Sequence, residues 1–147
     1  MDEIEASVTG VIEGYKAAVA ARDIDAFMRL YDPAVRVFDA WGVWTYEGVP
    51  TWKVPIESWF ASHPDDRHVV TFEDVSCVST PAFASVAAIV TYAMVSARGE
   101  QVGAMQNRLT WVLKQGASGL SIVHEHTSVP VGFEDQKAIL QRPAIVR

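Results

Sequence analysis

The sequence has little cysteine, little positive charge and no long apolar run. Cys77 is the only cysteine among 147 residues, which excludes an intramolecular disulfide and a multi-cysteine zinc or iron–sulfur site. Twelve Lys and Arg stand against 18 Asp and Glu, a net charge of −6, and no basic run occurs. This balance argues against a nucleic-acid partner.

Membrane and export signals are missing as well. No apolar stretch approaches the ~18 residues that a membrane span needs. The first ten residues, MDEIEASVTG, are acidic, unlike a signal or transit peptide. We therefore expect a cytoplasmic protein that does not enter a membrane.

The composition is that of a globular protein, with 50% hydrophobic and 20% charged residues. A chain of this length suggests one domain, and it can bury enough surface to fold without a disulfide or metal. We predict a single domain over residues 1–147, in which residues 131–147 form a C-terminal extension.

The front of the chain has the periodicity of helices. Apolar residues recur every three or four positions between Glu3 and Ala21, which predicts a helix. Asp23 is a good N-cap for a second, short helix with Tyr31 in its apolar stripe, ended by Asp32-Pro33. After a hairpin with a turn at Trp41-Gly42 and a short strand from Val43 to Tyr46, helical spacing returns. The third helix carries Trp52, Ile56, Trp59 and Phe60, with Pro55 in its first turn or at a kink.

The rest of the chain is typical of long strands joined by hairpin turns. The predicted strands are about Arg67–Val78, Phe83–Ala97, Gln101–Lys114 and Leu120–Ser128. Two of them approach a length of roughly 50 Å, too long for a flat sheet in so small a domain, so the sheet must bend strongly. We predict an α+β, cone-like fold in which three N-terminal helices cover the concave face of a strongly bent antiparallel sheet.

This order of elements resembles the nuclear transport factor 2-like superfamily, in particular its SnoaL-like branch. The ending Ser121-Ile-Val-His-Glu-His-Thr-Ser-Val-Pro130 is similar to the last strand of that branch and to the association domain of calcium/calmodulin-dependent kinase II. Asn107-Arg-Leu-Thr-Trp-Val-Leu113 resembles the preceding strand, and Asp32-Pro33, Phe38 and Glu47-Gly48 resemble the early hairpin. The resemblance covers about Ile4 to Pro130 and implies a pocket open at one end and a homodimer formed across the outer face of the sheet. The superfamily includes ketosteroid isomerase, cyclases, dehydratases and oligomerisation modules, so the fold does not select an activity.

The alignment with the kinase association domain also predicts which residues face the pocket. The arginines that line that domain's pocket fall on Val90, Trp111 and Thr127, so the basic ligand site is missing here. The same register gives an aromatic pocket with few polar groups, suited to a small, largely apolar molecule. Its predicted lining residues are Trp52, Ile56, Phe60, Tyr92, Asn107, Trp111, Glu125 and Thr127. The alternative is that these aromatic side chains simply fill the cone as core.

Glu125 is the first candidate for a catalytic acid or base, because an apolar cavity raises the pKa of a carboxyl toward neutrality. Asp39, at the end of the first strand, is the second candidate, and two carboxyls can divide the acid and base roles. The alternatives are a Glu125 paired with Arg108 or Arg36, and an Asp39 that accepts from backbone amides in a turn.

His124 and His126 share one face of the last strand, opposite to Glu125. A third metal ligand is missing nearby, since His63 and His68 lie on a distant loop and strand. We therefore predict no metal, and we place both histidines, with Arg108, Thr110 and Val112, on the outer face at the dimer contact. Cys77, without a basic neighbour in sequence, is interpreted as an unreactive strand residue.

These observations together favour a pocket protein that binds a small molecule, an isomerase, cyclase or dehydratase that transfers protons without a cofactor. The alternative is a non-catalytic ligand-binding or oligomerisation module.

Overall fold

The computed structural model describes residues 3–143, which form three helices and one mixed six-stranded sheet. The helices are α1 (Glu3–Ala21), α2 (Ile24–Met28) and α3 (Val49–Ala61). The strands are β1 (Tyr31–Phe38), β2 (Tyr46–Glu47), β3 (Arg67–Ser79), β4 (Phe83–Val95), β5 (Gln101–Gly116) and β6 (Gly119–Ser128). Of the predicted C-terminal extension, residues 144–147 lie outside the described part.

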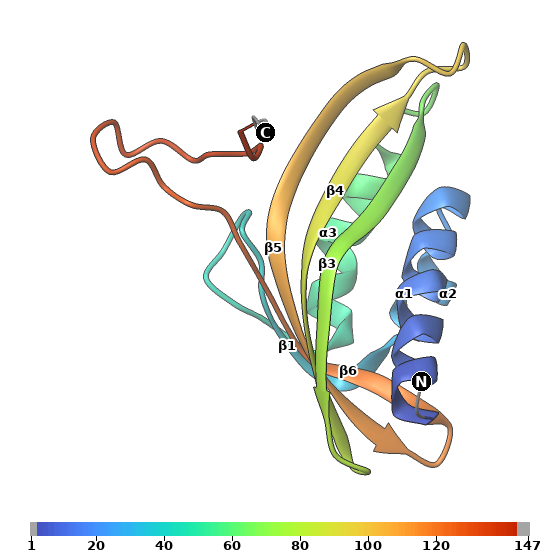
Figure 1. Cartoon of the computed structure of the whole chain (residues 1–147). Coiled ribbons are helices and arrows are strands. Elements are labelled where there is room, and N and C mark those ends of the chain that lie inside the picture. The colour runs from blue at the N-terminus through green and yellow to red at the C-terminus, as the bar shows by residue number, and fades with distance from the viewer. Residues whose placement is uncertain (1–2, 144–147) are drawn as a thin grey trace.

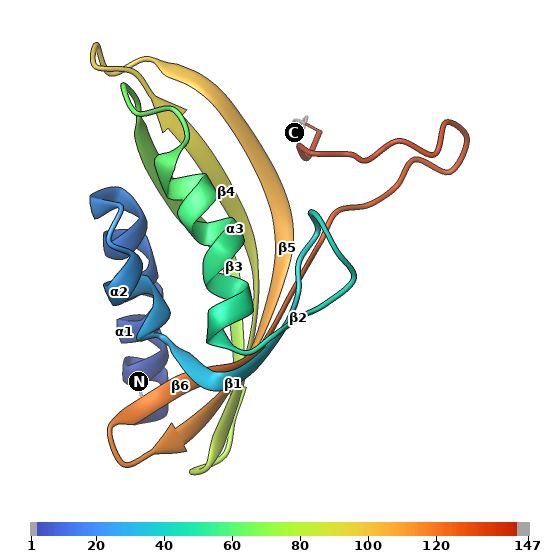
Figure 2. The ribbon, with the colours of Figure 1, turned by 180° about the vertical axis from the view of Figure 1, so that it is seen from behind.

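The sheet is bent around the helices, as the strand lengths predict. Its strand order is β2-β1-β6-β5-β4-β3, with antiparallel pairs except for β1, which runs parallel to β6. Shifts of register interrupt the β3–β4 ladder between Glu73 and Ser76, where Asp74 has a φ of 53°, and the β5–β6 ladder between Val112 and Leu113. Such bulges increase twist and bend strands. The curvature of β3, β4 and β5 is visible in Figure 1, and Figure 2 shows the same sheet from behind.

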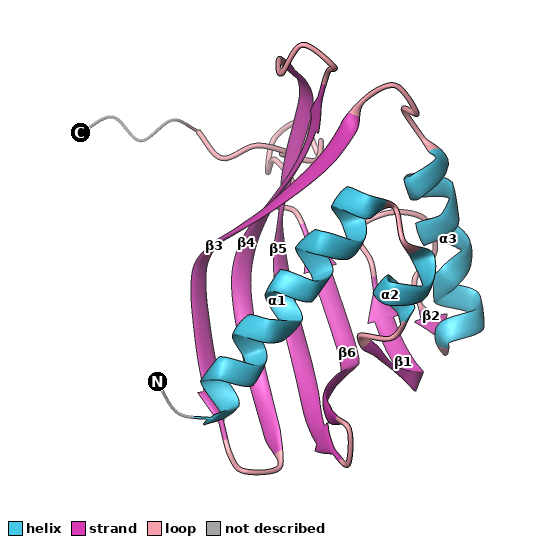
Figure 3. Ribbon diagram, turned by 90° about the vertical axis from the view of Figure 1, so that its right-hand side faces the viewer, coloured by secondary structure: helices cyan, strands magenta, loops and turns pink. Residues whose placement is uncertain are grey.

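The core lies between the concave face of the sheet and the helices. Helix α1 crosses this face, while α2 and α3 lie toward β1 (Figure 3). The side chains of Val19, Phe27, Trp111 and Ile122 are fully buried there. The apolar stripe of α1 and the inward side chains of the strands therefore form one core, beside which the site is built.

The end of the second helix and the start of the first strand differ from their predictions. Helix α2 is capped by Asp23, which accepts from the Ala26 N–H at 3.0 Å, but it ends at Met28. Tyr31 opens β1 instead of extending the helix, and Pro33 lies inside β1. The β1–β6 ladder is irregular between Tyr31 and Arg36, so the missing N–H of Pro33 breaks no pairing there.

The hairpin and the third helix also differ in detail. The predicted strand from Val43 to Tyr46 is wrong over most of its length, because only Tyr46–Glu47 pairs with β1. In α3, Pro50 occupies the first turn and Pro55 lies in the helix interior. Within residues 3–143, no helix has the length and apolar character needed to cross a membrane.

Candidate functional site

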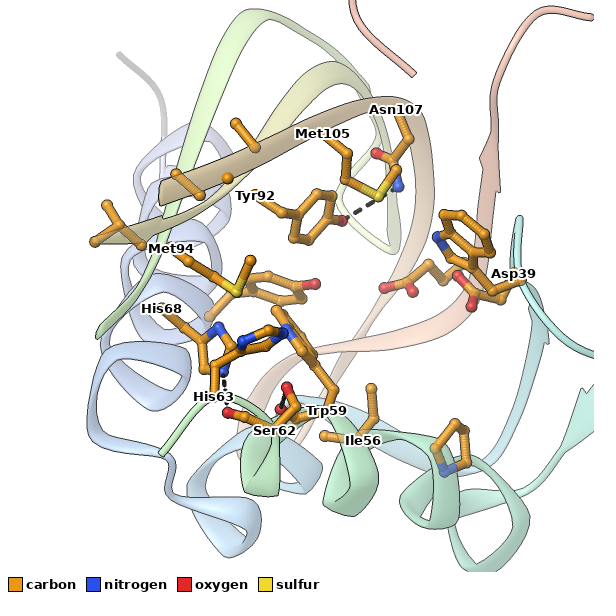
Figure 4. A pocket seen from close by; sticks show the side chains of 18 of the residues that line it. Asp39, Ile56, Trp59, Ser62, His63, His68, Tyr92, Met94, Met105 and Asn107 are labelled. Atoms are coloured by element: carbon orange, nitrogen blue, oxygen red, sulfur yellow. Dashed lines mark hydrogen bonds between the residues drawn. The ribbon is translucent and has the colours of Figure 1, made fainter. Parts of the chain in front are cut away.

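A cavity of about 600 Å³ lies between α3, the C-terminal half of β4, the N-terminal half of β5, and the C-terminal ends of β1 and β6. Trp52, Ile56 and Trp59 of α3 face Tyr92 and Asn107 across it. Aromatic and aliphatic groups make most of the wall, and Figure 4 shows polar side chains at both ends. A site of this size and character suits a small, largely apolar molecule.

Glu125 lies at one end of the cavity with only 2% of its surface exposed. Its Oε1 accepts a hydrogen bond from the Tyr31 hydroxyl at 2.6 Å and another from the Trp111 indole N–H at 2.9 Å. Burial raises the pKa of this carboxyl to about 7, and the two hydrogen bonds oppose the rise. Glu125 can therefore exist in both protonation states near neutral pH.

The cation partners considered for Glu125 are engaged elsewhere. Arg36 pairs with Glu47 at 3.6 Å, and Arg108 donates to the Ser128 hydroxyl at 3.0 Å. Within residues 3–143, no Lys or Arg forms an ion pair with Glu125. Nor does any described side chain hydrogen-bond to its second oxygen, Oε2, so Oε2 is the oxygen left for a ligand.

Asp39 also lines the cavity, just beyond the end of β1. The Thr127 hydroxyl donates to its Oδ1 at 2.8 Å. Burial raises the pKa of Asp39, and hydrogen bonds from Thr127 and from the backbone of Trp41 and Ala40 oppose the rise. Asp39 thus accepts from backbone amides in the turn after β1 and also forms part of the cavity wall. Its charge also raises the pKa of Glu125, so the two acids sense each other.

The parallel pairing of β1 with β6 brings the two carboxyls to the same end of the cavity. Val37 is opposite Glu125 in this ladder, and the chain continues from there to Asp39. His124 and His126 alternate with Glu125 along β6, so they face the other side of the sheet. There His124 Nδ1 lies 2.7 Å from the Arg36 carbonyl oxygen, and both imidazoles contact the Phe38 ring.

Three of the predicted lining residues lie behind the cavity wall. Phe60 is buried in the core against Phe27, with ring centroids 5.4 Å apart. Trp111 is fully buried and reaches the site through its hydrogen bond to Glu125, while Thr127 reaches it through Asp39. The other five predicted lining residues do line the cavity: Trp52, Ile56, Tyr92, Asn107 and Glu125. So does Asp39, which was predicted as the second acid.

The opposite end of the cavity carries two histidines that sequence reasoning left out of the site. His68 is 4% exposed, and its Nε2 donates to the Ser62 carbonyl oxygen at 3.1 Å. Burial lowers its pKa, which favours the neutral imidazole. His63 lies at the mouth. The signal for His68 was its alternation with buried Val70 in β3, which places both on the inner face.

Arg22 fixes the loop that carries His63. Its guanidinium donates to the carbonyl oxygens of Ser62 at 2.9 Å, His63 at 2.8 Å and Asp66 at 2.6 Å, and also to that of Phe60. One side chain from the end of α1 thus holds the mouth of the cavity in place.

Two buried polar atoms at the cavity have no hydrogen-bond partner among the described residues: the Trp52 indole N–H and Asn107 Oδ1. The Asn107 side-chain amide N–H donates a long hydrogen bond to the Tyr92 hydroxyl oxygen, at 3.5 Å. Buried polar groups left unpaired cost free energy, so a ligand or water that satisfies them is favoured. No cluster of three or more His, Cys, Asp or Glu suited to a metal ion occurs within residues 3–143.

An α+β cone with a cavity walled by helices and a bent sheet defines a class of pocket proteins. Comparison with protein families places the chain within that class: it belongs to the SnoaL-like domain family, whose profile matches residues 8–132. Comparison with curated proteins gave no match.

Solved structures show the same fold at low sequence identity. A nuclear transport factor 2-like protein of unknown function from Pseudomonas putida KT2440 is 19% identical, with a TM-score of 0.83, over 95% of this chain and 96% of that one. ActVI-ORFA from Streptomyces coelicolor is 12% identical, with a TM-score of 0.76, over 86% and 97%. A protein from Xanthomonas campestris, provisionally named a calcium/calmodulin-dependent protein kinase II association domain, is 17% identical, with a TM-score of 0.68, over 86% and 88%. These similarities establish the nuclear transport factor 2-like fold.

Proposed function

We propose that this protein binds a small, largely apolar molecule in the cavity and catalyses a proton transfer on it, with Glu125 as general base and acid. The observation that carries this proposal is a buried carboxyl with a pKa of about 7, facing a cavity and paired with no described cation. A group whose pKa lies near the working pH is the most effective proton carrier.

The hydrogen bonds of Glu125 define how the step would proceed. Tyr31 and Trp111 hold Oε1, so Oε2 removes a proton from a carbon or hydroxyl of the bound molecule. The C–H or O–H bond breaks, its electron pair stays on the substrate, and the proton rests on Oε2. Returning that proton to another atom of the substrate gives an isomerisation, and no cofactor or oxidant enters the balance. Asp39, at the same end of the cavity, is the second acid in a cyclisation or dehydration.

Asn107 specifies the ligand further. It lines the cavity and its Oδ1 has no hydrogen-bond partner among the described residues, so a ligand hydroxyl placed against this amide would be favoured. The substrate would therefore be an apolar molecule with a hydroxyl, and a carbonyl beside the reacting carbon would acidify the C–H bond that Glu125 breaks.

The experiment uses small cyclic ketones as probes. Each is incubated with the protein in D₂O, and loss of α-proton signal is followed by ¹H NMR. We expect exchange that rises with pH around 7 and is abolished in Glu125→Gln, while Glu57→Gln, an exposed position on α3, exchanges as the native protein does. Equal exchange in Glu125→Gln and native protein would contradict the catalytic role. Ligand binding without exchange by native protein would leave a binding module instead.

We also propose a homodimer formed across the outer face of the sheet. Support comes from the mixed apolar and hydrogen-bonding character of this face, which includes Arg108, Thr110, Val112, His124 and His126. Sedimentation at micromolar concentration tests it, and a monomer mass would refute it.

A further inference from the structure

The chain after β6 forms a small hairpin that projects from the outer side of the sheet. We call residues 131–139 the arm. Val131 pairs with Ala138, the Gly132 N–H donates to the Lys137 carbonyl at 2.8 Å, and the Ile139 N–H donates to the Pro130 carbonyl at 2.8 Å. Figures 1 and 2 both show the arm extending away from the helices.

The residues that follow the arm fix its base to the sheet. The Gln106 N–H donates to the Leu140 carbonyl at 2.6 Å. Arg142 pairs with Glu73 at 3.0 Å and with Asp74 at 3.1 Å, at the bulge of β3. The arm is therefore held at both ends, and its tip has a defined place relative to the sheet.

The tip presents an apolar side chain to solvent. Phe133 is 99% exposed, and Val131 beside it is 61% exposed. A hairpin of this size has no core of its own in which to bury a phenylalanine. A large aromatic side chain on a fixed support has the character of an interface anchor that inserts into another molecule.

A second cavity, which we call the outer groove, has aromatic side chains against which Phe133 could pack. It measures about 630 Å³ and lies between β6 and the β1–β2 connection. Its lining includes Arg36, Phe38, Asp39, Trp44, His126 and Thr127. Trp44 is 96% exposed, and the Arg36 guanidinium lies over the Phe38 ring, 4.8 Å from its centroid, so the groove combines aromatic surface with a cation.

Charge complementarity and symmetry identify the occupant. Glu134 and Asp135 follow Phe133 on the arm, and Arg36 borders the outer groove. Within residues 3–143, Arg36 pairs with Glu47 through Nε only, at 3.6 Å, so its terminal nitrogens are left for a carboxylate of the arm. Because arm and groove belong to the same chain, a two-fold dimer makes the contact twice, once in each direction. His126 also belongs to the face assigned to the homodimer above, on which this inference rests. We infer that the arm of one protomer docks in the outer groove of a second copy, with Phe133 against Phe38 and Trp44.

This contact would complete the candidate site. Asp39 borders both the outer groove and the inner cavity, and Trp41 beside it lines the inner cavity. An arm seated in the groove covers the Asp39 end of the cavity from outside. The partner thereby excludes water next to one of the two carboxyls, which strengthens the electrostatic interactions there.

Equilibrium sedimentation of Phe133→Ser tests the anchor. We expect the dimer dissociation constant to rise about tenfold or more, as for an interface anchor, while an unchanged far-UV circular dichroism spectrum shows that the variant still folds. Val78→Ser is the control. Val78 is 78% exposed at the C-terminal end of β3, outside the arm and the outer groove, so its substitution should leave the dimer dissociation constant unchanged. A native dimer that Phe133→Ser does not weaken refutes the arm contact and leaves the homodimer standing. A native monomer refutes both, while the exchange assay of Glu125→Gln judges the catalytic proposal separately.

Disulfide trapping between two differently tagged chains tests the pairing itself. In a Cys77→Ala background, one chain carries Glu134→Cys and the other Val43→Cys, a position on the rim of the groove. We expect a cross-linked heterodimer on mild oxidation. The pair Glu134→Cys and Val78→Cys should not link. Equal yields from the two pairs, or no link from the first, would overturn the inference.

Discussion

Replacing Glu125 by Gln removes a titrating group from the core while keeping its shape. Gln retains a carbonyl oxygen that can accept from Tyr31 and Trp111, as Oε1 of Glu125 does. The variant should therefore fold. What it loses is the dependence of stability on the protonation of this one carboxyl.

The direction of that dependence follows from the raised pKa. The pKa of Glu125 is about 7 in the folded protein and 4.5 without the protein environment. Between these values the folded state holds a proton that the unfolded state has lost, so stability is greatest below pH 4.5 and falls as the pH rises through 7. A shift from 4.5 to 7 corresponds to about 3 kcal/mol in total at 1.36 kcal/mol per pH unit, of which about 2.5 kcal/mol is lost between pH 5 and pH 8.

Urea unfolding at pH 5 and pH 8 measures the effect. The free energy of unfolding of Glu125→Gln, relative to that of the native protein, should be about 2.5 kcal/mol larger at pH 8 than at pH 5, so the variant gains relative stability as the pH rises. Taking this difference cancels the contribution of His68, whose pKa is also shifted. Glu57→Gln should show the same relative stability at both pH values. A relative stability of Glu125→Gln that does not change with pH would refute the reasoning, and carboxyl-carbon NMR of Glu125 would then show an ordinary titration.

Three further perturbations have definite outcomes. Tyr31→Phe removes a donor to the Glu125 carboxylate and should raise its pKa further, at a cost of about 1–3 kcal/mol at pH 8, as read by NMR titration and urea unfolding. Phe27→Ala empties a fully buried position and should cost about 3–5 kcal/mol, measured by urea unfolding with an unchanged m value. Chelator should leave the melting temperature unchanged, and elemental analysis should find no stoichiometric zinc, iron or nickel. A metal held by His124 and His126 would appear in the elemental analysis, and its removal by chelator would lower the melting temperature.

The long elements were predictable because hydrophobic periodicity is strong over many residues. Helix α1 has its predicted bounds, and the four strands from Arg67 to Ser128 agree with their predictions to within a few residues. Tyr31 was assigned to a helix because it continues a helical spacing from Phe27. Tertiary structure decides otherwise, since the Tyr31 hydroxyl bonds to Glu125, far along the chain. A contact of that separation leaves no local signal.

For strand residues, alternation predicts which side chains share a face, and the alignment with the kinase association domain predicts which of the two faces is inward. Glu125, Asn107 and Tyr92 were predicted in this way, and they line the cavity. Phe60 and Trp59 are neighbours on α3, and the sequence does not say which of two adjacent aromatic residues faces the cavity. Trp59 lines it and Phe60 packs in the core. The grouping of His63 with His68 needed the loop geometry that Arg22 imposes, which no spacing rule contains.

Because side chains alternate along β4 and β5, the same strands supply cavity-lining residues on one face and surface residues on the other. Tyr92, Met94 and Met105 line the cavity, while Thr91 and Gln106 alternate with Tyr92 and Met105 and bond to each other on the other face, where the Gln106 amide donates to the Thr91 hydroxyl at 3.0 Å. A mutant library restricted to these three positions therefore varies the shape offered to a ligand and leaves the outer surface of the sheet as it is. Ligand choice can be selected in the laboratory, or diverge between relatives, without a compensating change in that outer surface.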